Sequence, residues 1–254
     1  MLIDTHAHLY LEDFMHDLEE VIQRAYSIGV KKIILPNIDS GSIKKMLDLA
    51  DAYPQICYPL IGLHPTSVET DFREELEAIE YWLGRRKFFG IGEIGIDLYW
   101  DKSKLKEQVE AFRIQVNLAK RLQLPVVIHV RDSFEEVYSI VKEEQDGNLK
   151  GIFHCFSGTF QDAERITGLG FYLGIGGVIT FKNSNLSEVI KQIDIHHLVL
   201  ETDSPYLAPV PRRGQRNESG YLSVIAQKVA QIHNCPVESV AKITSENARS
   251  LFGI

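Results

Sequence analysis

The sequence predicts a single (β/α)8 barrel domain spanning residues 1–254, in the α/β class, with extra helices at its C-terminal end. Three observations support this prediction. Short apolar runs alternate with longer amphipathic stretches, which is the pattern of parallel strands joined by helices. Eight such runs occur in 254 residues, about the size of one barrel. No GxGxxG follows the first run, which weakens the rival doubly wound sheet.

The expected strands are apolar runs of four to seven residues. Because long helical stretches separate them, we expect the strands to be parallel and connected by right-handed crossovers. In chain order they are Leu2–Thr5, Lys32–Leu35, Gln55–Ile61, Phe88–Glu93, Pro125–His129, Gly151–His154, Gly170–Ile175 and Leu198–Glu201.

Helices are expected where apolar residues recur every three or four positions between the strands. The clearest of these patterns cover Asp17–Ile28, Ser103–Leu122 and Phe134–Glu143. A loop rich in Pro, Arg and Gly, Ser204–Gly220, follows the eighth strand. Two more helical patterns, Tyr221–His233 and Val237–Phe252, come after this loop. We expect both of these helices to pack outside the barrel.

The composition is typical of a globular protein, with 44% hydrophobic and 24% charged residues. The three cysteines form no CxxC pair, which favours a reducing compartment over a disulfide or cysteine-zinc framework. The first residues, MLIDTHAHL, lack the features of a signal peptide, and no apolar run approaches the ~20 residues of a membrane span. We therefore expect a cytoplasmic protein without membrane contacts. We expect a monomer, because no apolar stripe is left over.

The net charge is −8, from 27 Lys and Arg against 35 Asp and Glu. This balance excludes a general affinity for polyanions and argues against tight binding to long duplexes. It does not exclude an enzyme that acts on nucleic acid, because a site in which metal ions meet the phosphates needs only local positive charge.

Residues that suit metal ions stand at the ends of five predicted strands. They are, in chain order, His6, His8, Glu93, His129, His154 and Asp203. Side chains alternate along a strand, so His6 and His8 point the same way and can hold one ion. The C-terminal ends of barrel strands converge on one mouth. Imidazoles and carboxylates without thiolates suit a divalent ion, so the set predicts a metal-dependent active site.

The remaining histidines fit a metal site less well. His64 follows the third strand without an HxH companion, so we expect it to contact substrate or a ligand residue. Cys155 comes after His154 in a strand, so alternation places it on the opposite face, in the core. No Ser-His-Asp or Cys-His pairing suggests a covalent nucleophile. We expect four histidines to be surface residues: His16, His196, His197 and His233.

Eight motifs resemble those of the TatD family of metal-dependent nucleases, a branch of the amidohydrolase-like barrels. The resemblance covers essentially the whole chain. IDTHAHL occurs in many metallohydrolases, whereas GEIGID together with HCFSG and ETDSPYLAP is specific. In chain order the motifs are IDTHAHL, IGLHP, GEIGID, LPVVIHVRD, FHCFSG, LGIGG, LVLETDSPYLAP and RGQRNES.

The resemblance implies a centre of two divalent metal ions. Mg²⁺ or Mn²⁺ is expected from the carboxylates, and Zn²⁺ stays open because of the four imidazoles. Related amidohydrolases often use a modified lysine as the bridge, and here a glutamate stands in the matching place. Carried over residue by residue, the ligands are His6, His8 and Asp203 for one ion, His129 and His154 for the other, and Glu93 for both.

Two bridged ions suit in-line displacement at a phosphodiester by an activated water. We expect Asp203 to act as the general base in addition to being a ligand. Glu201 lies two residues earlier. It either orients a ligand from outside the centre or is a surface carboxylate, and the sequence favours neither alternative.

Several residues near the strand ends are candidates for holding a substrate. The backbone N–H groups of Ser157 and Gly158 precede a helix that begins near Thr159, where they could bind a phosphate. Asp97 and Tyr99 follow Glu93, and Tyr99 is a candidate for stacking on a base. The candidate phosphate contacts, which are alternatively part of a solvated surface, are Arg131 and, in the loop after the eighth strand, Arg212, Arg213 and Arg216 beside Asn217 and Glu218.

The resemblance and the compact barrel mouth together favour a 3′–5′ exonuclease that acts on single-stranded DNA ends. RNA stays open as a substrate, because no contact to a 2′-hydroxyl can be identified. A small-molecule amidohydrolase, lactonase or aminoacyl-tRNA deacylase fits the same barrel and HxH motif. A metal-dependent binding module without enzymatic activity is the third alternative.

Overall fold

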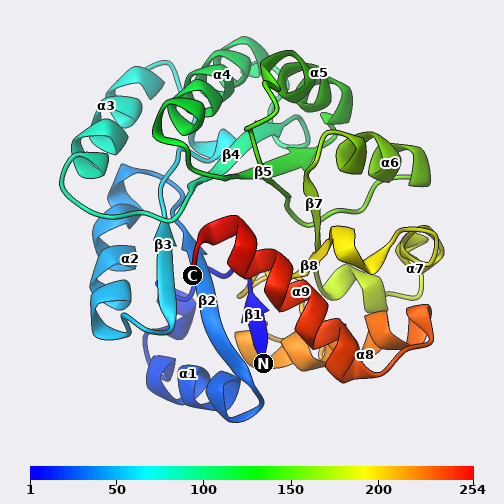
Figure 1. Cartoon of the computed structure of the whole chain (residues 1–254). Helices are drawn as coiled ribbons and strands as arrows, with labels where there is room; N and C mark the ends of the chain where they lie inside the picture. Colours follow the sequence, from blue (N-terminus) through cyan, green and yellow to red (C-terminus); the bar gives the residue numbers. More distant parts are fainter.

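The computed structural model covers residues 1–254 and alternates strand and helix as predicted (Figure 1). No helix combines the length and the apolar composition needed to cross a bilayer. The strands are β1 (Leu2–Asp4), β2 (Val30–Pro36), β3 (Cys57–Leu60), β4 (Ile91–Asp97), β5 (Val126–Arg131), β6 (Gly151–Phe153), β7 (Tyr172–Ile175) and β8 (Leu198–Leu200). The α-helices are α1 (Leu18–Ser27), α2 (Ser40–Ala52), α3 (Phe72–Leu83), α4 (Leu105–Leu122), α5 (Phe134–Glu144), α6 (Phe160–Gly168), α7 (Leu186–Ile190), α8 (Leu222–His233) and α9 (Val237–Phe252).

Parallel pairing closes the eight strands into a barrel. Hydrogen bonds join β1, β2 and β3 in one segment and β4 to β8 in another, each strand pairing with the next in sequence. Single parallel bridges join the segments, Ile61 with Ile91 on one side and Ala7 with Ser204 on the other. The predicted (β/α)8 barrel is confirmed.

The fourth strand differs from the prediction. We expect its end at Glu93, whereas β4 continues to Asp97. The register with β5 shifts between Ile91 and Ile94, because these two residues pair with Val126 and Ile128. Three steps along β4 therefore match two along β5, which is a β-bulge. A bulge leaves one residue outside the regular ladder and re-aims nearby side chains, and Glu93 lies at this point.

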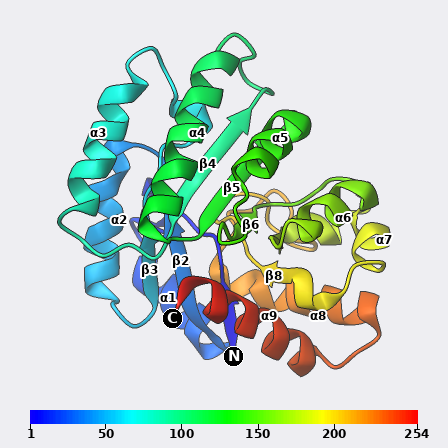
Figure 2. The same cartoon turned by 45° about the horizontal axis from the view of Figure 1, so that its top comes forward.

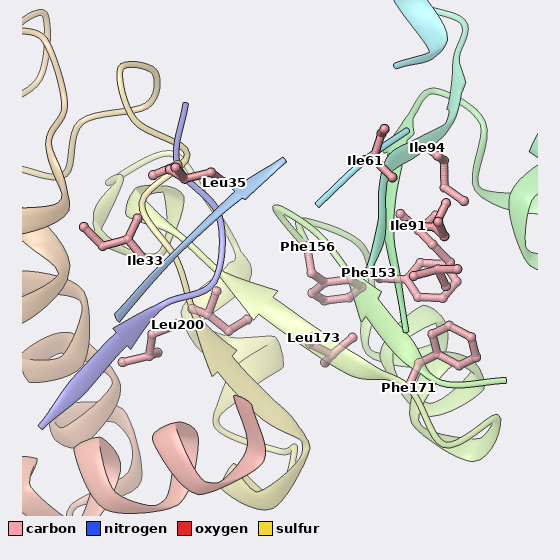
Figure 3. Close-up of a cluster of buried hydrophobic side chains, with 14 of the residues drawn as sticks. Ile33, Leu35, Ile61, Ile91, Ile94, Phe153, Phe156, Phe171, Leu173 and Leu200 are labelled. Atoms are coloured by element: carbon pink, nitrogen blue, oxygen red, sulfur yellow. The ribbon is translucent and has the colours of Figure 1, made fainter. Parts of the chain in front are cut away.

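The outer faces of the strands pack against the surrounding helices (Figure 2). Figure 3 shows part of this layer, in which aliphatic and aromatic side chains from several strands are buried. They include Ile33 and Leu35 of β2, Ile91 and Ile94 of β4, Phe153 of β6, Leu173 of β7 and Leu200 of β8.

The last helix, α9, closes the N-terminal end of the barrel. Figure 1 shows it lying across the middle of the strand ring, beside both chain termini. Its residues Ala248, Leu251 and Phe252 share one buried cluster with strand residues, which are Ile3, Ile34, Tyr58, Leu60, Val127, Ile152 and Val199. The expectation that both C-terminal helices pack outside the barrel is therefore wrong for α9, since its apolar face enters the end of the barrel. Helix α8 packs beside β1 and β8.

A substitution at Gly151, the first residue of β6, tests how closely the strands pack. A Cβ added at Gly151 would lie 2.2 Å from the Val126 carbonyl oxygen, which is backbone and cannot move aside. We expect Gly151→Ala to lower the free energy of unfolding by about 1–3 kcal/mol. Gly168→Ala is the matched control, because a Cβ at this end of α6 would meet nothing within 4 Å. It should be neutral or gain up to about 1 kcal/mol. Denaturant unfolding measures both, and equal stability of the two variants would contradict the packing argument.

Candidate metal centre

Three of the expected ligands meet where β1 and β8 run side by side. The ligand atoms of His6, His8 and Asp203 all lie within 4.8 Å of one another. The Nε2 atoms of His6 and His8 are 3.1 Å apart, and each lies 3.8 Å from Asp203 Oδ1. Backbone hydrogen bonds hold this arrangement, because the Asp203 N–H donates to the His6 carbonyl oxygen and the His8 N–H donates to that of Ser204.

Glu93 lies between this group and the other histidines. Its Oε2 is 3.0 Å from His6 Nε2 and 3.7 Å from His8 Nε2. Its Oε1 is 2.7 Å from His129 Nδ1 and 3.8 Å from His154 Nε2. One carboxylate therefore turns one oxygen to His6 and His8 and the other to His129 and His154. These two groups adjoin, since the ligand atoms of His6, Glu93 and His154 also lie within 4.8 Å of one another. The His6 and His154 rings, which belong to different groups, stack 3.5 Å apart between centroids.

The sequence around Glu93 explains how a carboxylate reaches this position. A Cβ added at Gly92 would lie 2.8 Å from Val127 Cβ, so β4 approaches β5 too closely for any other residue. Gly95 has a φ of +152°, and an added Cβ would lie 2.0 Å from the His129 carbonyl oxygen. The two glycines allow the bulge in β4 and let Glu93 turn into the barrel.

For three of the four imidazoles, a partner outside the ligand set lies at the nitrogen that faces away from the centre. The Nε2–H of His129 donates to Asp97 Oδ2 at 2.9 Å, which leaves Nδ1 toward the centre. His154 Nδ1 lies 2.9 Å from Glu201 Oε1, which leaves Nε2 inward. His8 Nδ1 lies 3.2 Å from the Pro36 carbonyl oxygen. Carboxylates and carbonyls that orient the second imidazole nitrogen are typical of metal-binding histidines.

The donor set fits divalent metal ions. Burial lowers the pKa of His6 well below its ordinary value and that of His8 to about 4, so both imidazoles are neutral and present lone pairs. Burial alone would raise the pKa of Glu93, but the neighbouring histidines outweigh it and hold this pKa well below its usual value. Neutral imidazoles and an ionised carboxylate that converge in a buried site are the ligands that Zn²⁺, Mn²⁺ and related ions bind. His154 differs from His6 and His8, because Glu201 and Glu93 outweigh its burial and raise its pKa to about 10, so it must lose a proton to become a ligand.

His64 also reaches the centre, as an expected contact rather than as a fifth imidazole donor. Its Nε2 lies 3.4 Å from Glu93 Oε1. The Thr66 N–H donates to His64 Nδ1 at 3.1 Å, so in the neutral ring the proton is on Nε2. This nitrogen is therefore a hydrogen-bond donor directed at the mouth.

Glu201 and Asp97 are buried and contact the ligands directly. Glu201 is fully buried, so the alternative of a surface carboxylate is wrong. Its Oε1 also accepts the Cys155 N–H at 2.5 Å. Asp97 is the last residue of β4 rather than part of a loop, and its second oxygen accepts the Tyr99 N–H at 3.0 Å.

The prediction that the loop after the eighth strand contacts phosphate is wrong for two of its residues. Arg216 forms a two-pronged ion pair with Asp17, at 2.7 and 2.6 Å, so its guanidinium ties the loop to the N-terminus of α1. Asn217 is fully buried and donates to the carbonyl oxygens of Thr202 and Tyr206. Both residues shape the loop from within. Arg212 and Arg213 are exposed, and Arg213 lies over the Phe181 ring at 3.9 Å.

The loop at Ser157 and Gly158 differs from expectation too. It does precede α6, but Asp162 Oδ2 accepts the Thr159 N–H at 2.9 Å in a capping box. A Cβ added at Gly158 would lie 3.0 Å from the same carboxylate oxygen. This carboxylate places a negative charge beside the loop, which disfavours a second anion there.

The sequence did not predict the positions of three other residues near the centre. Cys155 lies beyond the end of β6 with a φ of +47°, so strand alternation does not apply, and its Sγ lies within 4.8 Å of the ligand atoms of His154 and Glu201. Asp4 is fully buried and accepts from Thr202 N and Oγ1, which joins β1 to β8. The only indication in the sequence that Asp4 joins these strands was its place two residues before His6 in the motif IDTHAH. Tyr206 packs edge-on near His8.

The family described as TatD related DNase matches residues 3–253. The chain belongs to the TatD family of metal-dependent hydrolases. It is 42% identical to the uncharacterized metal-dependent hydrolase YabD of Bacillus subtilis over 255 residues, covering 100% of both chains. It is 34% identical to YjjV of Escherichia coli, also an uncharacterized metal-dependent hydrolase, covering 99% of this chain and 98% of YjjV.

Solved structures of TatD-type proteins share the whole fold. The crystal structure of the TatD homologue YjjV from Escherichia coli superposes with a TM-score of 0.94, covering 100% of this chain and 98% of that one. A TatD family hydrolase from Entamoeba histolytica gives a TM-score of 0.86 at 25% identity, covering 99% and 97%. The family named from the sequence motifs is therefore confirmed.

Divalent ions should stabilise the folded protein, because the ligands converge only in the native state. At a free ion concentration ~100-fold above Kd, the gain is about 2.7 kcal/mol. Thermal unfolding with Mg²⁺, Mn²⁺ or Zn²⁺, compared with EDTA, measures it. Glu93→Gln should lose most of the gain, whereas Glu77→Gln, at an exposed carboxylate on α3, should keep it. Equal unfolding midpoints with ion and with chelator would contradict the assignment.

The orienting carboxylates should matter for ion affinity although they are not ligands. We expect Asp97→Asn and Glu201→Gln to weaken binding by about 10- to 100-fold, because His129 and His154 lose the partner that sets their proton position. Competition with a chromophoric chelator measures the affinity. Asp101→Asn, at an exposed carboxylate in the loop that follows Asp97 and β4, is the control. Wild-type affinity in both orienting variants would be evidence against this role.

Proposed function

We propose that this protein is a metal-dependent nuclease that hydrolyses phosphodiester bonds, acting from the 3′ end of single-stranded DNA. One observation carries the proposal. Glu93 turns one oxygen to His6 and His8 and the other to His129 and His154, which suits two ions held by a common bridge. Two bridged ions are a recurrent solution for in-line displacement at phosphodiesters. The family description, TatD related DNase, supports the same chemistry.

In this proposal, His6, His8 and Asp203 would hold one ion, His129 and His154 would hold the other, and Glu93 would serve both. Mg²⁺ or Mn²⁺ suits the carboxylates, and Zn²⁺ suits the imidazoles. When bound, the ions neutralise charge on the phosphodiester and lower the pKa of a nearby water.

Asp203 is the proposed general base. Its side chain is 14% exposed, compared with 3% for Glu93, so it is the carboxylate of the centre that water and substrate can reach. Its Oδ1 faces His6, His8 and His154, at 3.7 to 3.8 Å. A proton taken from the attacking water would be held on this carboxylate and released to solvent through the open mouth.

His64 and Arg131 are the proposed contacts to the phosphate. His64 Nε2 carries a proton and points at Glu93 from the mouth. Arg131, the last residue of β5, is exposed and stacks over Tyr99 at 3.8 Å. On a chain with net charge −8, Arg131 supplies the local positive charge that a polyanion requires, and His64 adds a hydrogen-bond donor.

A single-stranded DNA oligonucleotide with a 5′ label tests the proposal. We expect a ladder of shortening labelled products with Mg²⁺ or Mn²⁺ and none with EDTA. The same strand with a 3′ label should release the label at once. Glu93→Gln should lower kcat/KM by about 100-fold or more, corresponding to about 3 kcal/mol of lost charge stabilisation. Glu77→Gln should leave kcat/KM unchanged.

Other outcomes of this assay are equally informative. A ladder from the 3′ label alone would reverse the polarity, and faster cleavage of the matching RNA would change the sugar preference. No cleavage by folded, metal-loaded protein would overturn the nuclease proposal. Turnover of a lactone or aminoacyl-ester panel would then favour the amidohydrolase or deacylase alternative.

A further inference from the structure

Three exposed aromatic residues lie on the loops that surround the mouth of the barrel. Tyr99 and Trp100 follow β4 and are 54% and 69% exposed, and Tyr206 follows β8 and is 50% exposed. The chain has only two tryptophans, and the other, Trp82, packs against the core from α3. An indole that leaves most of its surface in water, beside a candidate active site, is available to bind a planar ligand.

The Trp100 ring contacts two neighbouring side chains. Its ring meets that of Tyr99 edge to face, with centroids 5.0 Å apart and planes at 88°. The Arg131 guanidinium lies 3.8 Å from the centre of the Tyr99 ring and 5.4 Å from that of Trp100. Arg131 covers Tyr99, so Trp100 presents the more open surface, with a positive charge beside it.

The loop that carries Trp100 is tied to a histidine of the centre through one carboxylate. Asp97 Oδ1 accepts the backbone N–H groups of Tyr99 and Trp100, at 3.0 and 3.4 Å. Its Oδ2 accepts from His129 Nε2 at 2.9 Å. The backbone of Trp100 is therefore connected to His129 through the two oxygens of Asp97.

Tyr206 lies close to His8 and Asp203, which belong to the other group of ligands. Its ring centroid lies 6.3 Å from that of His8, with the planes at 64°. Its backbone N–H donates to the Asp203 carbonyl oxygen at 2.8 Å. One exposed aromatic residue is thus linked to the histidines of each half of the centre, with Glu93 between the halves.

We propose that Trp100 and Tyr206 are stacking surfaces for the two unpaired nucleobases that flank the scissile phosphodiester. This inference rests on the proposed function and specifies its substrate. Aromatic side chains stack on any base, while a nearby cation contacts the backbone, which is how single-stranded nucleic acid is bound without sequence preference. A paired base cannot stack in this way, so both nucleotides at the cleaved bond must be unpaired.

Oligonucleotides with a missing base test the proposal. The substrate is a 12-nucleotide single strand in which an abasic residue replaces either nucleotide flanking the first bond that is cut. Each substitution should lower kcat/KM of the wild type by about 5- to 150-fold, the range expected for one stacked base. Trp100→Ala should lose the response to one position only and Tyr206→Ala the response to the other, mainly through KM.

Matched variants separate stacking from general damage. Trp100→Phe and Tyr206→Phe keep a ring and should retain most of the response to the missing base. Tyr81→Ala removes a tyrosine of α3 that is 53% exposed, and should behave as wild type. Trp82→Phe leaves Trp100 as the only tryptophan, and its fluorescence should be quenched by intact single-stranded DNA but not by the duplex.

The outcomes distinguish this inference from the proposed function. If the wild type cleaves intact and abasic strands equally well, or both alanine variants keep the wild-type response at both positions, the stacking proposal is overturned while the nuclease proposal stands. If the wild type cleaves no strand with any ion, the nuclease proposal fails and the stacking proposal fails with it. Loss of one positional response per alanine variant supports the proposal.

Discussion

The buried carboxylate of Glu93, shared between two groups of imidazoles, is the interaction on which the rest of the site depends. Its two oxygens lie 3.0 Å from His6 Nε2 and 2.7 Å from His129 Nδ1. An ionised group in so buried a place is costly unless other charges or donors surround it. The bulge in β4, the glycines that flank Glu93, and the closure of the barrel between β8 and β1 all serve to bring those neighbours to it.

The barrel divides stability and chemistry between its two ends. At the N-terminal end, Leu251 and Phe252 of α9 pack with Val127, Ile152 and Val199 inside the strand ring. Two residues further along the same strands come His129, His154 and Glu201, which share the inward face because side chains alternate. The apolar layer thus lies directly beneath the polar one. It excludes water from below, so the polar residues at the mouth meet solvent from one side only.

Asp97 connects the loop of Tyr99 and Trp100 to His129 through a single side chain. One oxygen orients His129, and the other holds the turn that carries Tyr99 and Trp100. A change in the position of this loop would therefore also change the hydrogen bond that orients His129. The chain is acidic overall, and Arg131 places a positive charge where this loop meets the end of β5.

Local sequence determined the alternation of strands and helices, the barrel, and the six residues His6, His8, Glu93, His129, His154 and Asp203 that meet at its mouth. These follow from side-chain periodicity and from position at strand ends, which are properties of short segments. Tertiary structure alone decided that β4 runs on through a bulge to Asp97, that α9 closes the barrel, and that Glu201 is buried against His154. It also decided that Arg216 forms an ion pair with Asp17. It placed the Asp162 carboxylate at the N-terminus of α6, beside the loop where a phosphate was expected. Each of these depends on which distant segment becomes a neighbour, and a contact between residues 199 positions apart leaves no local pattern from which to infer it.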